Sequence, residues 1–439
     1  MVARPGPGSR CESTREKGSS LTRKAVIVGQ GYVGLPVAMR AVEVGYDVVG
    51  IDLDSNRIAA LKVGASYVDD ISDAVLARAL ESGRYRATTD YDDTAGFDVA
   101  VITVPTPLRE SLPDLTFIEE SSRSLATRLK RGATVVLEST TYPGTTEELV
   151  VPLLEEGSGL VAGTDFFVGY SPERIDPGNT TWGFVNTPKV VSGIDAESLA
   201  RVQSFYDDLV DRTVPVSTPK EAELTKLLEN TFRHVNIALV NELAIFAHQL
   251  GVNIWESIDA ASTKPFGYMK FTPGPGVGGH CLPVDPSYLS WQVRRKLGRS
   301  FRFVELANDV NDHMPDYVLQ RLMAILNADK RPLNGSRIAL IGLAYKKNSG
   351  DIRESPSLRL IELLDEYGAT IVAVDEHVVK ERWPAAVERA GDVAAALEGA
   401  DAAILVTDHD ELDLRGLEGA GVPVLDTKNR LVGDTVVRL

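Results

Sequence analysis

The chain has 439 residues, of which 44% are hydrophobic and 25% are charged, proportions typical of a soluble protein of about three domains. Its formal net charge of -16 argues against nucleic acid or an anionic membrane as a partner. The two cysteines, Cys11 and Cys281, stand far apart in unlike contexts, so they predict no disulfide framework and fit a reducing cytoplasm. Residues 1–20 lack the apolar stretch of a signal peptide and predict a disordered extension. No later segment has the unbroken apolar length that a membrane span needs.

A strand, a glycine-rich turn, a helix and a second strand follow one another near the N-terminus. The first apolar run is 24–28, and the second, 47–51, ends at Asp52. The turn between the first run and the helix contains Gly29, Gly31, Tyr32, Val33 and Gly34. In a Rossmann unit such a turn holds a pyrophosphate against the helix N-terminus, and the acidic residue binds a ribose hydroxyl. This arrangement, with Asp52 at the end of the second strand, predicts NAD rather than NADP, because the Asp52 carboxylate would repel the 2'-phosphate of NADP. Arg57 is either a contact to the cofactor or a solvent-exposed helix charge.

Three further apolar runs, 98–104, 133–137 and 166–171, continue the alternation of strands and helices. Thr106 follows the first of them, Thr140 follows the second, and a charged loop follows the third. Because open parallel sheets bind ligands at the carboxyl ends of their strands, both threonines are candidates for a cofactor or substrate site. Hydroxyl groups at these positions also commonly cap the next helix.

The segment 219–250 predicts one long helix. Apolar residues recur in it at helical spacing: Leu224, Leu227, Leu228, Phe232, Val235, Leu239, Leu243 and Phe246. Lys226 and Asn230 are four residues apart, so they share one face of the helix, and Arg233 and Asn236 extend this polar side. Such a face is either part of a site or merely solvated. A helix of this length also offers a surface to a partner subunit.

A glycine-rich segment, 274–286, contains Cys281. Glycine lets a backbone approach a ligand closely, and Gly276, Gly278 and Gly279 precede the cysteine. His280 is adjacent, and Asp285 follows four residues later. A single cysteine is more often a small buried residue, but these neighbours favour a nucleophile in a loop that interrupts the helices of 251–330.

The strand-helix alternation returns after residue 330, with strands at 334–341, 369–374, 402–406 and 422–425. No complete GxGxxG is present here. The loop after the first strand carries Lys346, Lys347 and Arg353 instead. Cationic side chains at a strand end suit a diphosphate, and the alternative is a solvent-exposed basic loop.

These elements predict an α/β fold with two Rossmann-like domains with parallel sheets joined by a central long-helix segment. The predicted NAD-binding domain is 21–215. The central helical domain, with the cysteine segment and a dimerisation surface, is 216–330. The domain for the second, nucleotide-containing ligand is 331–439.

The chain resembles the UDP-glucose/GDP-mannose dehydrogenase family, the nucleotide-sugar 6-dehydrogenases, over nearly its whole length. The resemblance rests on GxGYVGLP at 29–36, VPTP at 104–107, ST at 139–140, SPE at 171–173, KLxEN at 226–230, GGHCLPVDP at 278–286 and GLAYKK…DIRESP at 342–356. It implies NAD as cofactor, a nucleotide-diphosphate sugar as substrate, no metal, and a homodimer or higher homo-oligomer.

The resemblance also implies the roles of individual residues. The implied catalytic residues are Cys281 as nucleophile, Lys226 and Asn230 for the oxyanion, Asp285 and Thr140 for the water, and Glu173 of the SPE loop. Implied cofactor contacts are Gly29, Gly31, Tyr32, Val33, Gly34, Asp52, Arg57, Thr106, Ser139, Thr140 and Arg353. Implied substrate contacts are Glu173, Arg174, Lys226, Asn230, Arg233, Gly276, Gly278, Tyr345, Lys346 and Lys428.

The implied reaction is a four-electron oxidation of a C6 hydroxymethyl group to a carboxylate through a cysteine thiohemiacetal and thioester. Three positions depart from many glucose-type members: Pro177 replaces a glutamate, Val284 a lysine, and Lys428 an arginine. The first two favour a UDP-N-acetylhexosamine over UDP- or dTDP-glucose, and the third leaves uridine and thymidine open. The alternatives from other classes are a two-electron β-hydroxyacid dehydrogenase and a non-catalytic sensor of NAD or nucleotide sugars.

Overall fold

The structure is a computed structural model that describes residues 23–68, 70–109, 112–175, 179, 181–279 and 281–439. At Leu108, Cys281 and Pro283 it describes the backbone alone. The predicted N-terminal extension, Cys11, Pro177 and His280 therefore lie outside the described residues.

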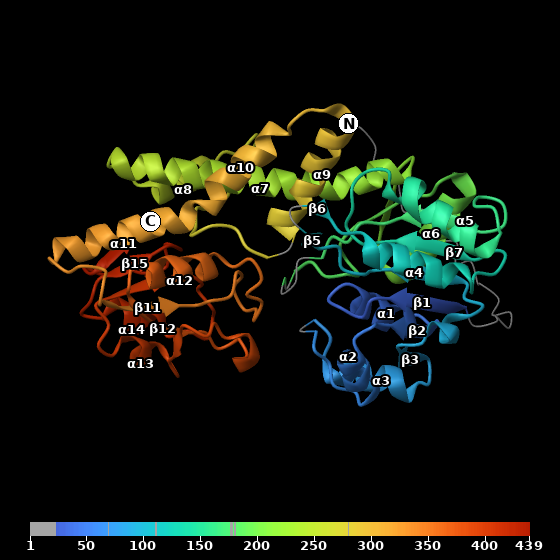
Figure 1. The fold of residues 1–439 in the computed structure, drawn as a ribbon, viewed down its shortest axis with the longest axis horizontal. Coiled ribbons are helices and arrows are strands. Elements are labelled where there is room, and N and C mark those ends of the chain that lie inside the picture. The colour runs from blue at the N-terminus through green and yellow to red at the C-terminus, as the bar shows by residue number, and fades with distance from the viewer. Residues whose placement is uncertain (1–22, 69, 110–111, 176–178, 180, 280) are drawn as a thin grey trace, which may run out of the picture.

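The N-terminal unit is built on a six-stranded parallel sheet of order β3-β2-β1-β4-β7-β8. Its strands are β1 (Lys24–Val28), β2 (Asp47–Ile51), β3 (Tyr85–Thr88), β4 (Val99–Ile102), β7 (Thr134–Leu137) and β8 (Phe167–Tyr170). Every residue of β4, β7 and β8 is buried, as expected for parallel strands covered on both faces. The two covering layers are visible in Figure 1.

Helices cover both faces of this sheet. One face packs against α1 (Gly34–Glu43), α3 (Asp73–Glu81) and α6 (Ala196–Leu209). The other packs against α4 (Thr116–Ala126) and α5 (Val151–Ser158), which follows a single π-turn, η2 (Thr146–Val150). Smaller elements complete the unit: α2 (Ser55–Lys62), η1 (Tyr91–Thr94), the pair β5 (Leu108–Arg109) and β6 (Leu112–Pro113), and the pair β9 (Lys189–Val191) and β10 (Thr213–Pro215).

The C-terminal unit repeats this plan, with a six-stranded parallel sheet of order β13-β12-β11-β14-β15-β16. Its strands are β11 (Arg337–Ile341), β12 (Thr370–Val374), β13 (Glu388–Arg389), β14 (Ala402–Leu405), β15 (Val424–Asp426) and β16 (Val436–Arg438). One face packs against α11 (Met314–Ala328) and α12 (Pro356–Glu366), the other against α13 (Val393–Leu397) and α14 (Leu414–Glu418). A short turn, η3 (Lys380–Arg382), follows β12.

One helix, α7 (Pro219–Gln249), runs across both units (Figure 1). Its 31 residues give it a length of about 46 Å at 1.5 Å per residue. Between α7 and the C-terminal unit come α8 (Ile254–Ser262), α9 (Cys281–Leu297) and α10 (Arg302–Asp312), and α9 and α10 pack along α7. The predicted fold class is confirmed, because two Rossmann-like sheets are joined by this long helix.

The burial of α7 is the reverse of that of an ordinary amphipathic helix. Its buried positions include charged and amide side chains. Its exposed positions form an apolar stripe of Leu224, Leu228, Phe232, Leu239, Leu243 and Phe246. The sequence predicted the helix and its period correctly, but most of the periodic apolar residues face outward.

The cysteine segment also differs from the predicted loop. Residue 281 is the first residue of α9, which continues through Pro286. Proline near the start of a helix costs little because the first amide groups have no partner within the helix. Asp285 therefore lies on a helix, one turn beyond residue 281 and on the same face.

The predicted domain boundaries lie in connecting segments. Residue 215 ends β10 shortly before α7, and residue 330 lies between α11 and β11. The exact boundaries remain predictions. No helix in the described part of the chain is long and apolar enough to cross a membrane.

Candidate active site

The glycine turn between β1 and α1 has the shape that a pyrophosphate requires. Gly29 has φ +93, and a Cβ there would lie 2.7 Å from the carbonyl oxygen of Thr103, so this position needs glycine. A Cβ at Gly34 would overlap the carbonyl of Gly29, whereas one at Gly31 would meet no atom within 4 Å. The turn is therefore tight on its inner side and open at Gly31. Helix α1 begins after Val33 without a side-chain cap or an acidic residue in its first turn, which leaves its N–H groups to an anion.

Asp52 lies at the end of β2 with acceptor capacity to spare. Its Oδ2 accepts the Gln30 N–H at 2.9 Å, and its Oδ1 accepts the Asp54 N–H at 2.9 Å. Arg57 reaches Oδ2 at 3.4 Å with a half-exposed side chain. A carboxylate has room for about four hydrogen bonds, so Asp52 fits the ribose hydroxyls of NAD.

Three hydroxyl side chains follow strands β4 and β7, and they differ in whether they already have a hydrogen-bond partner. The Ser139 hydroxyl donates to the carbonyl of Val104 at 2.7 Å, so it ties the two strand ends together. Thr106 is buried, and its side chain hydrogen-bonds with Tyr288. Thr140 is half-buried, and its hydroxyl has no hydrogen-bond partner within the described part of the chain. The Thr106 carbonyl accepts the Tyr288 hydroxyl of α9, which fixes α9 against the cofactor side of the first unit.

Helix α7 carries a line of buried polar residues, here called its polar face: Glu223, Lys226, Asn230, His234 and Asn241. Each reaches a different part of the molecule. Glu223 accepts the backbone N–H groups of Gly144 and Thr146, at 2.5 and 2.9 Å, and so holds the loop that follows Thr140.

The remaining members of the polar face reach the neighbouring segments. Lys226 donates to the carbonyl of Glu173. His234 contacts Asn308 of α10 at 2.7 Å, and Asn241 accepts the Gly274 N–H at 2.9 Å. The face therefore joins loops of the N-terminal unit to the central segment along one helix.

Asp285 is the carboxyl group at the centre of this arrangement. Asn230 Nδ2 donates to its Oδ2 at 2.6 Å, and its side chain is buried. Burial raises the pKa of Asp285 to about 7, against the lowering effects of the Lys226 charge and the Asn230 hydrogen bond. A carboxyl group with such a pKa exchanges protons readily near neutral pH.

The segment around Cys281 connects the two units. On its N-terminal side, the Gly279 N–H donates to the Arg353 carbonyl of the C-terminal unit at 2.9 Å. On its C-terminal side, Asp285 and Tyr288 of α9 bind α7 and the first unit. Residue 281 thus stands where the two nucleotide-binding units meet; its side chain lies outside the described residues.

Glu173 follows β8 and lies against Lys226 and Lys189. Its Oε1 accepts the N–H of Arg174 at 2.6 Å, and its Oε2 lies 3.6 Å from Lys189 Nζ. Burial opposes ionisation, yet the Lys189 charge outweighs it with help from Glu138 and Lys226, so the pKa of Glu173 falls below its ordinary value.

Two predicted substrate residues point elsewhere in this structure. The Arg174 guanidinium binds Glu229 of α7, at 2.6 and 3.3 Å, and the Pro188 carbonyl, at 2.6 Å. Arg233 is exposed, and the buried position beside it on α7 is taken by His234. The structure therefore brings Lys226, Asn230, Asp285 and Glu173 together, while Arg174 braces the loop and Arg233 lies apart.

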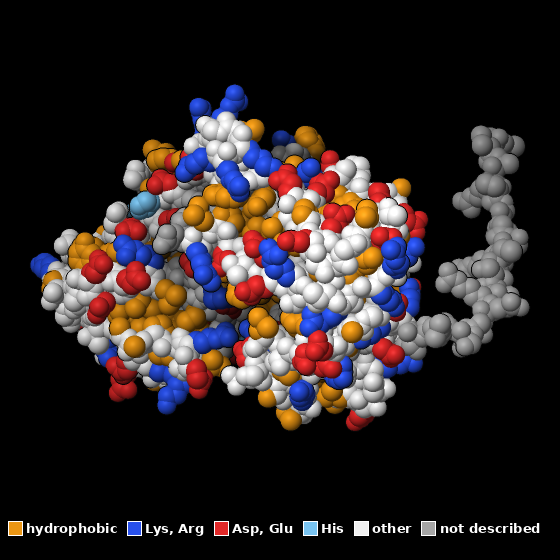
Figure 2. Space-filling view, turned by 45° about the vertical axis from the view of Figure 1, so that its right-hand side comes forward, with side chains coloured by type: hydrophobic (Ala, Val, Ile, Leu, Met, Phe, Trp, Pro, Cys, Tyr) orange, Lys and Arg blue, Asp and Glu red, His pale blue; other side chains and the backbone are white. Residues whose placement is uncertain are grey.

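The second nucleotide site lies on the loop between β11 and α12. The 274–279 segment presses on this loop, because a Cβ at Gly278 would lie 2.6 Å from Tyr345 Cβ. Gly276 has φ +135, and a Cβ there would lie 3.1 Å from Pro356. Tyr345 and Lys346 therefore border the glycine segment. Figure 2 shows Lys and Arg side chains around a hollow between the two lobes.

Cationic side chains border this second site from two directions. A Cβ at Gly274 would lie 3.6 Å from Lys428 Nζ, and burial lowers the pKa of Lys428 against the charges of Asp408 and Asp426. Arg353 binds Asp351 at 2.6 Å and lies close enough to Tyr345, and to Tyr32 on the glycine turn, to interact with them electrostatically. Its contact with NAD stays a prediction.

Sequence reasoning did not single out several residues that shape this site: Glu138, Lys189, Glu223, His234 and Tyr288. Glu223 and His234 continue the spacing of Lys226 and Asn230 on α7, a signal that was present in the sequence. No signal in the sequence marked Lys189, because a lysine in a short strand normally faces solvent.

Three family models match the chain. The NAD binding domain of the UDP-glucose/GDP-mannose dehydrogenase family matches residues 23–210, the central domain 220–313, and the UDP binding domain 339–433. The chain is 38% identical over 402 residues to a UDP-N-acetyl-D-glucosamine 6-dehydrogenase of Pseudomonas aeruginosa, across 90% of this chain and 92% of that one. It is 35% identical over 399 residues to a UDP-N-acetyl-D-mannosamine dehydrogenase of Pyrococcus horikoshii, across 91% and 92%.

Solved structures agree with these matches. The UDP-D-ManNAc dehydrogenase structure from Pyrococcus horikoshii has a TM-score of 0.85 at 34% identity, across 94% of this chain and 98% of that one. A UDP-glucose dehydrogenase from Pyrobaculum islandicum also gives 0.85, at 27% identity, across 97% and 99%. The chain therefore belongs to the UDP-glucose/GDP-mannose dehydrogenase family, a family of NAD-dependent nucleotide-sugar dehydrogenases.

Proposed function

We propose that this protein oxidises the C6 hydroxymethyl group of a UDP-N-acetylhexosamine to a carboxylate, in two consecutive two-electron steps. The observation that carries the proposal is the buried contact between Asn230 and Asp285. It joins the amide donor of α7, one turn beyond Lys226, to a carboxyl group with a pKa of about 7 that lies one helical turn beyond residue 281 on α9. Overall, one sugar alcohol and one water give one carboxylate, two hydrides and three protons.

In the first oxidation Lys226 and Asn230 act on the C6 oxygen. The glycine turn and Asp52 would hold NAD, which when bound would supply the hydride acceptor for both oxidations. Lys226 and Asn230 donate hydrogen bonds to the oxygen as negative charge develops on it, the electrostatic stabilisation that preorganised buried donors provide. In the present structure Lys226 binds the Glu173 carbonyl, so substrate takes the place of an existing acceptor.

In the second oxidation the nucleophile is Cys281. Its thiolate sulfur bonds to the aldehyde carbon while the carbonyl oxygen takes a proton, and loss of hydride and of that proton from the thiohemiacetal leaves a thioester. Residue 281 is the first residue of α9, where the helix dipole favours a thiolate. The covalent bond retains the intermediate between the two oxidations.

Hydrolysis then releases the product. Asp285, Thr140 and Glu173 orient a water molecule. Its oxygen bonds to the thioester carbon, the carbon–sulfur bond breaks with its electron pair on sulfur, and a water proton passes to Asp285. Asp285 is suited to this transfer because its pKa of about 7 lies near the working pH.

Two observations support an N-acetylhexosamine as the sugar. Val284, where many glucose-type members have lysine, is buried against Leu227 and Tyr288, a setting that suits an apolar residue. The relatives named for N-acetylhexosamine substrates share 35% and 38% identity with the chain, whereas the UDP-glucose dehydrogenase structure shares 27%.

The stoichiometry of NADH tests the reaction and the substrate together. The unmodified enzyme is incubated with UDP-N-acetylglucosamine, UDP-N-acetylmannosamine, UDP-glucose, dTDP-glucose and GDP-mannose. We expect about two NADH per sugar with one UDP-N-acetylhexosamine, as a four-electron oxidation requires. About one NADH per sugar would mean that the reaction stops at the aldehyde, and a preference for UDP-glucose would overturn the sugar assignment.

The cysteine itself offers a matched pair of variants. Cys281→Ser should reduce uronate formation by about a hundredfold or more, because the covalent step is lost. Cys11→Ser removes the other cysteine of the chain and should leave the rate unchanged. Full uronate output from Cys281→Ser, measured by chromatography of the product, would rule out the thioester route.

We also propose that the enzyme assembles as a homodimer through the apolar stripe of α7. Leu228 and Leu239 in this stripe are 63% and 52% exposed, and long apolar stripes on soluble proteins mark interfaces. Leu239→Glu should convert the dimer to monomer in light scattering. Val161→Glu, at a residue that is 54% exposed in the first unit, is the control; a Leu239→Glu protein that remains dimeric would exclude this interface.

A further inference from the structure

A buried charge network lies behind Glu173, away from the residues assigned to the reaction. It consists of Glu138 at the end of β7, Lys189 at the start of β9 and Tyr206 in α6. These side chains are almost fully buried, at 1%, 3% and 0% exposure. Lys189 Nζ forms an ion pair with Glu138 Oε1, and the Tyr206 hydroxyl donates to Glu138 Oε2 at 2.6 Å. The Pro172 carbonyl accepts a further hydrogen bond from Lys189 Nζ at 3.1 Å.

The two carboxylate oxygens of Glu173 have unequal surroundings. Oε1 accepts the backbone N–H groups of Arg174 and Ile175. Oε2 is buried and receives no hydrogen bond from an N–H or hydroxyl group in the described part of the chain; Lys189 Nζ lies 3.6 Å away. A buried oxygen without a donor costs about 1–3 kcal/mol, and a proton on Glu138, which hydrogen-bonds to Glu173 when protonated, can supply that donor.

Two carboxyl groups, those of Glu173 and Glu138, share the ammonium group of Lys189. The titratable groups that act on Glu173 or are acted on by it are Glu138, Lys189, Tyr170, Tyr206 and Lys226. Lys226 uses its ammonium group on the backbone carbonyl of Glu173. Lys189 is therefore the cation beside the carboxylate itself, and it faces two carboxylates at once.

Competition for one ammonium group divides the protons unequally between the two glutamates. Burial raises the pKa of Glu138 to about 7, because Lys189 only partly offsets burial and the nearby charge of Glu173 adds to it. Burial opposes the ionisation of Glu173, but the Lys189 charge, the hydrogen bond with Glu138 and the Lys226 charge together lower its pKa. Such unequal sharing is the known behaviour of two carboxyl groups in one buried site.

We propose that Lys189 and Glu138 are positioning residues for the hydrolysis step, with Lys189 holding Glu173 ionised and Glu138 anchoring Lys189 and, when protonated, donating a hydrogen bond to Glu173. This inference rests on the proposed role of Glu173 in orienting water. Neither residue touches substrate; both act through the charge and position of Glu173.

Two single variants test the network because each removes a group that holds Glu173 ionised. Lys189→Met removes the cation beside the carboxylate, and Glu138→Ala removes a hydrogen-bond donor, so both raise the pKa of Glu173. Glu173 acts when ionised, so the low-pH side (acid limb) of the profile of uronate formation against pH should move to higher pH in both variants. Glu138→Gln, whose amide can still donate, should stay close to the unmodified profile. We expect about one pH unit for Lys189→Met, the usual effect of one neighbouring charge, and less for Glu138→Ala.

The matched control is Lys220→Met, which removes an exposed lysine paired with Glu147 at 3.0 Å and should leave the acid limb in place. Lys189→Arg, which keeps the charge, should stay closer to the unmodified profile than Lys189→Met does. A purely structural network would lower the rate in Lys189→Met and Glu138→Ala without moving the acid limb. An acid limb that stays fixed in both variants, or that moves to lower pH, overturns the proposal.

A second readout needs neither turnover nor a foldable lysine variant. Infrared difference spectra between the full-length protein and its Glu173→Gln variant isolate the carboxylate band of Glu173 during a pH titration. The same subtraction in the Glu138→Ala background should place the band's midpoint at a higher pH; an unchanged midpoint overturns the proposal even where Lys189→Met fails to fold. The NADH stoichiometry of the unmodified enzyme tests the proposed function separately, so either idea can fail without the other.

Discussion

The two Rossmann-like units share one strand order but use the same position differently. In each sheet an aspartate follows the second strand: Asp52 after β2 and Asp375 after β12. The Asp52 side chain is 10% exposed and contacts two backbone N–H groups and Arg57. The Asp375 side chain is fully buried.

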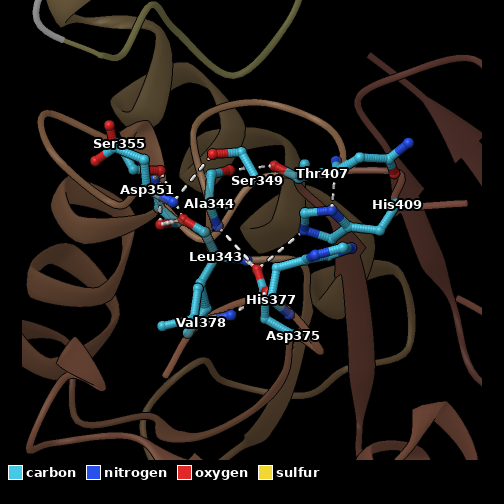
Figure 3. Close-up of polar contacts among 12 residues, drawn as sticks. Leu343, Ala344, Ser349, Asp351, Ser355, Asp375, His377, Val378, Thr407 and His409 are labelled. Atoms are coloured by element: carbon cyan, nitrogen blue, oxygen red, sulfur yellow. Dashed lines mark hydrogen bonds and ion pairs between the residues drawn. The ribbon is translucent and has the colours of Figure 1, made fainter. Parts of the chain in front are cut away.

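Five donors surround Asp375. They are the N–H groups of Leu343, Ala344, His377 and Val378, at 2.7 to 3.0 Å, and His409 Nε2 at 3.1 Å (Figure 3). Burial opposes ionisation, but the His409 hydrogen bond and these N–H groups lower the pKa of Asp375 to about 2. The first unit leaves its carboxylate with acceptor capacity for the proposed ribose contact, whereas the second uses its carboxylate to shape the loop that carries Tyr345 and Lys346. The same topology therefore does not imply the same ligand contact.

The variant with the largest expected effect disrupts the hydrogen bonds around Asp375 in the second unit. Asp375→Asn keeps the size of the side chain but replaces an acceptor oxygen with a donor, which opposes the inward N–H groups and His409. Breaking a buried, charge-assisted network costs about 3–5 kcal/mol, so the apparent Tm in calorimetry should fall by several degrees. Asp52→Asn is the matched variant and should change the Tm little. Equal losses in the two variants would contradict the contrast drawn between the units.

The next effect concerns the first unit. Asp52→Ala should raise the KM for NAD by about ten- to a hundredfold, because a hydrogen bond to a charged group contributes about 1.5–3 kcal/mol. The KM for the nucleotide sugar should not change. Asp54→Ala, which removes the N-cap of α2, is the control at a neighbouring acid. Steady-state kinetics with NAD varied would refute the assignment if the two variants behaved alike.

How much of the fold and of the candidate site can be predicted from the sequence depends on whether the signal lies in residues close together along the chain. The glycine turn, Asp52 and the shared face of Lys226 and Asn230 follow from spacing along the chain. The outward apolar stripe of α7 does not, because periodicity shows that a face exists without showing what covers it. The partners of Asp375 come from the three loops that follow β11, β12 and β14, so only tertiary structure shows that its carboxylate is already occupied.

A third effect distinguishes the two buried aspartates by pH. Asp375 has a lowered pKa, so its contribution to stability is present above the unfolded value of 3.8 and is lost as the pH falls toward 2. Asp285 has a raised pKa, about 7 against 3.8, so the folded state binds the extra proton and its stability falls as the pH rises from about 4 to 7. Asp285→Asn should remove part of this decline. Its Tm relative to the unmodified protein should therefore be higher at pH 8 than at pH 4.5, by the equivalent of about 1–2 kcal/mol. A difference that does not vary with pH would show that Asp285 is not protonated in the folded enzyme.

The smallest effect concerns the nitrogen-containing side chain that contacts each aspartate. Arg57 has a side chain that is 47% exposed and reaches Asp52 at 3.4 Å, and exposed ion pairs contribute about 0–1 kcal/mol. Arg57→Ala should therefore lower the Tm by a degree or two at most and raise the KM for NAD only a few-fold. His409 is the counterpart in the second unit: it is fully buried, its Nε2 donates to Asp375, and its Nδ1 accepts the Asn348 N–H at 2.9 Å. His409→Ala leaves those partners unsatisfied inside the protein, so its Tm should fall more than that of Arg57→Ala. If Arg57→Ala instead raised the KM for NAD as strongly as Asp52→Ala, Arg57 would be a direct contact to the cofactor, and the first unit would bind ribose through the ion pair rather than through Asp52 alone.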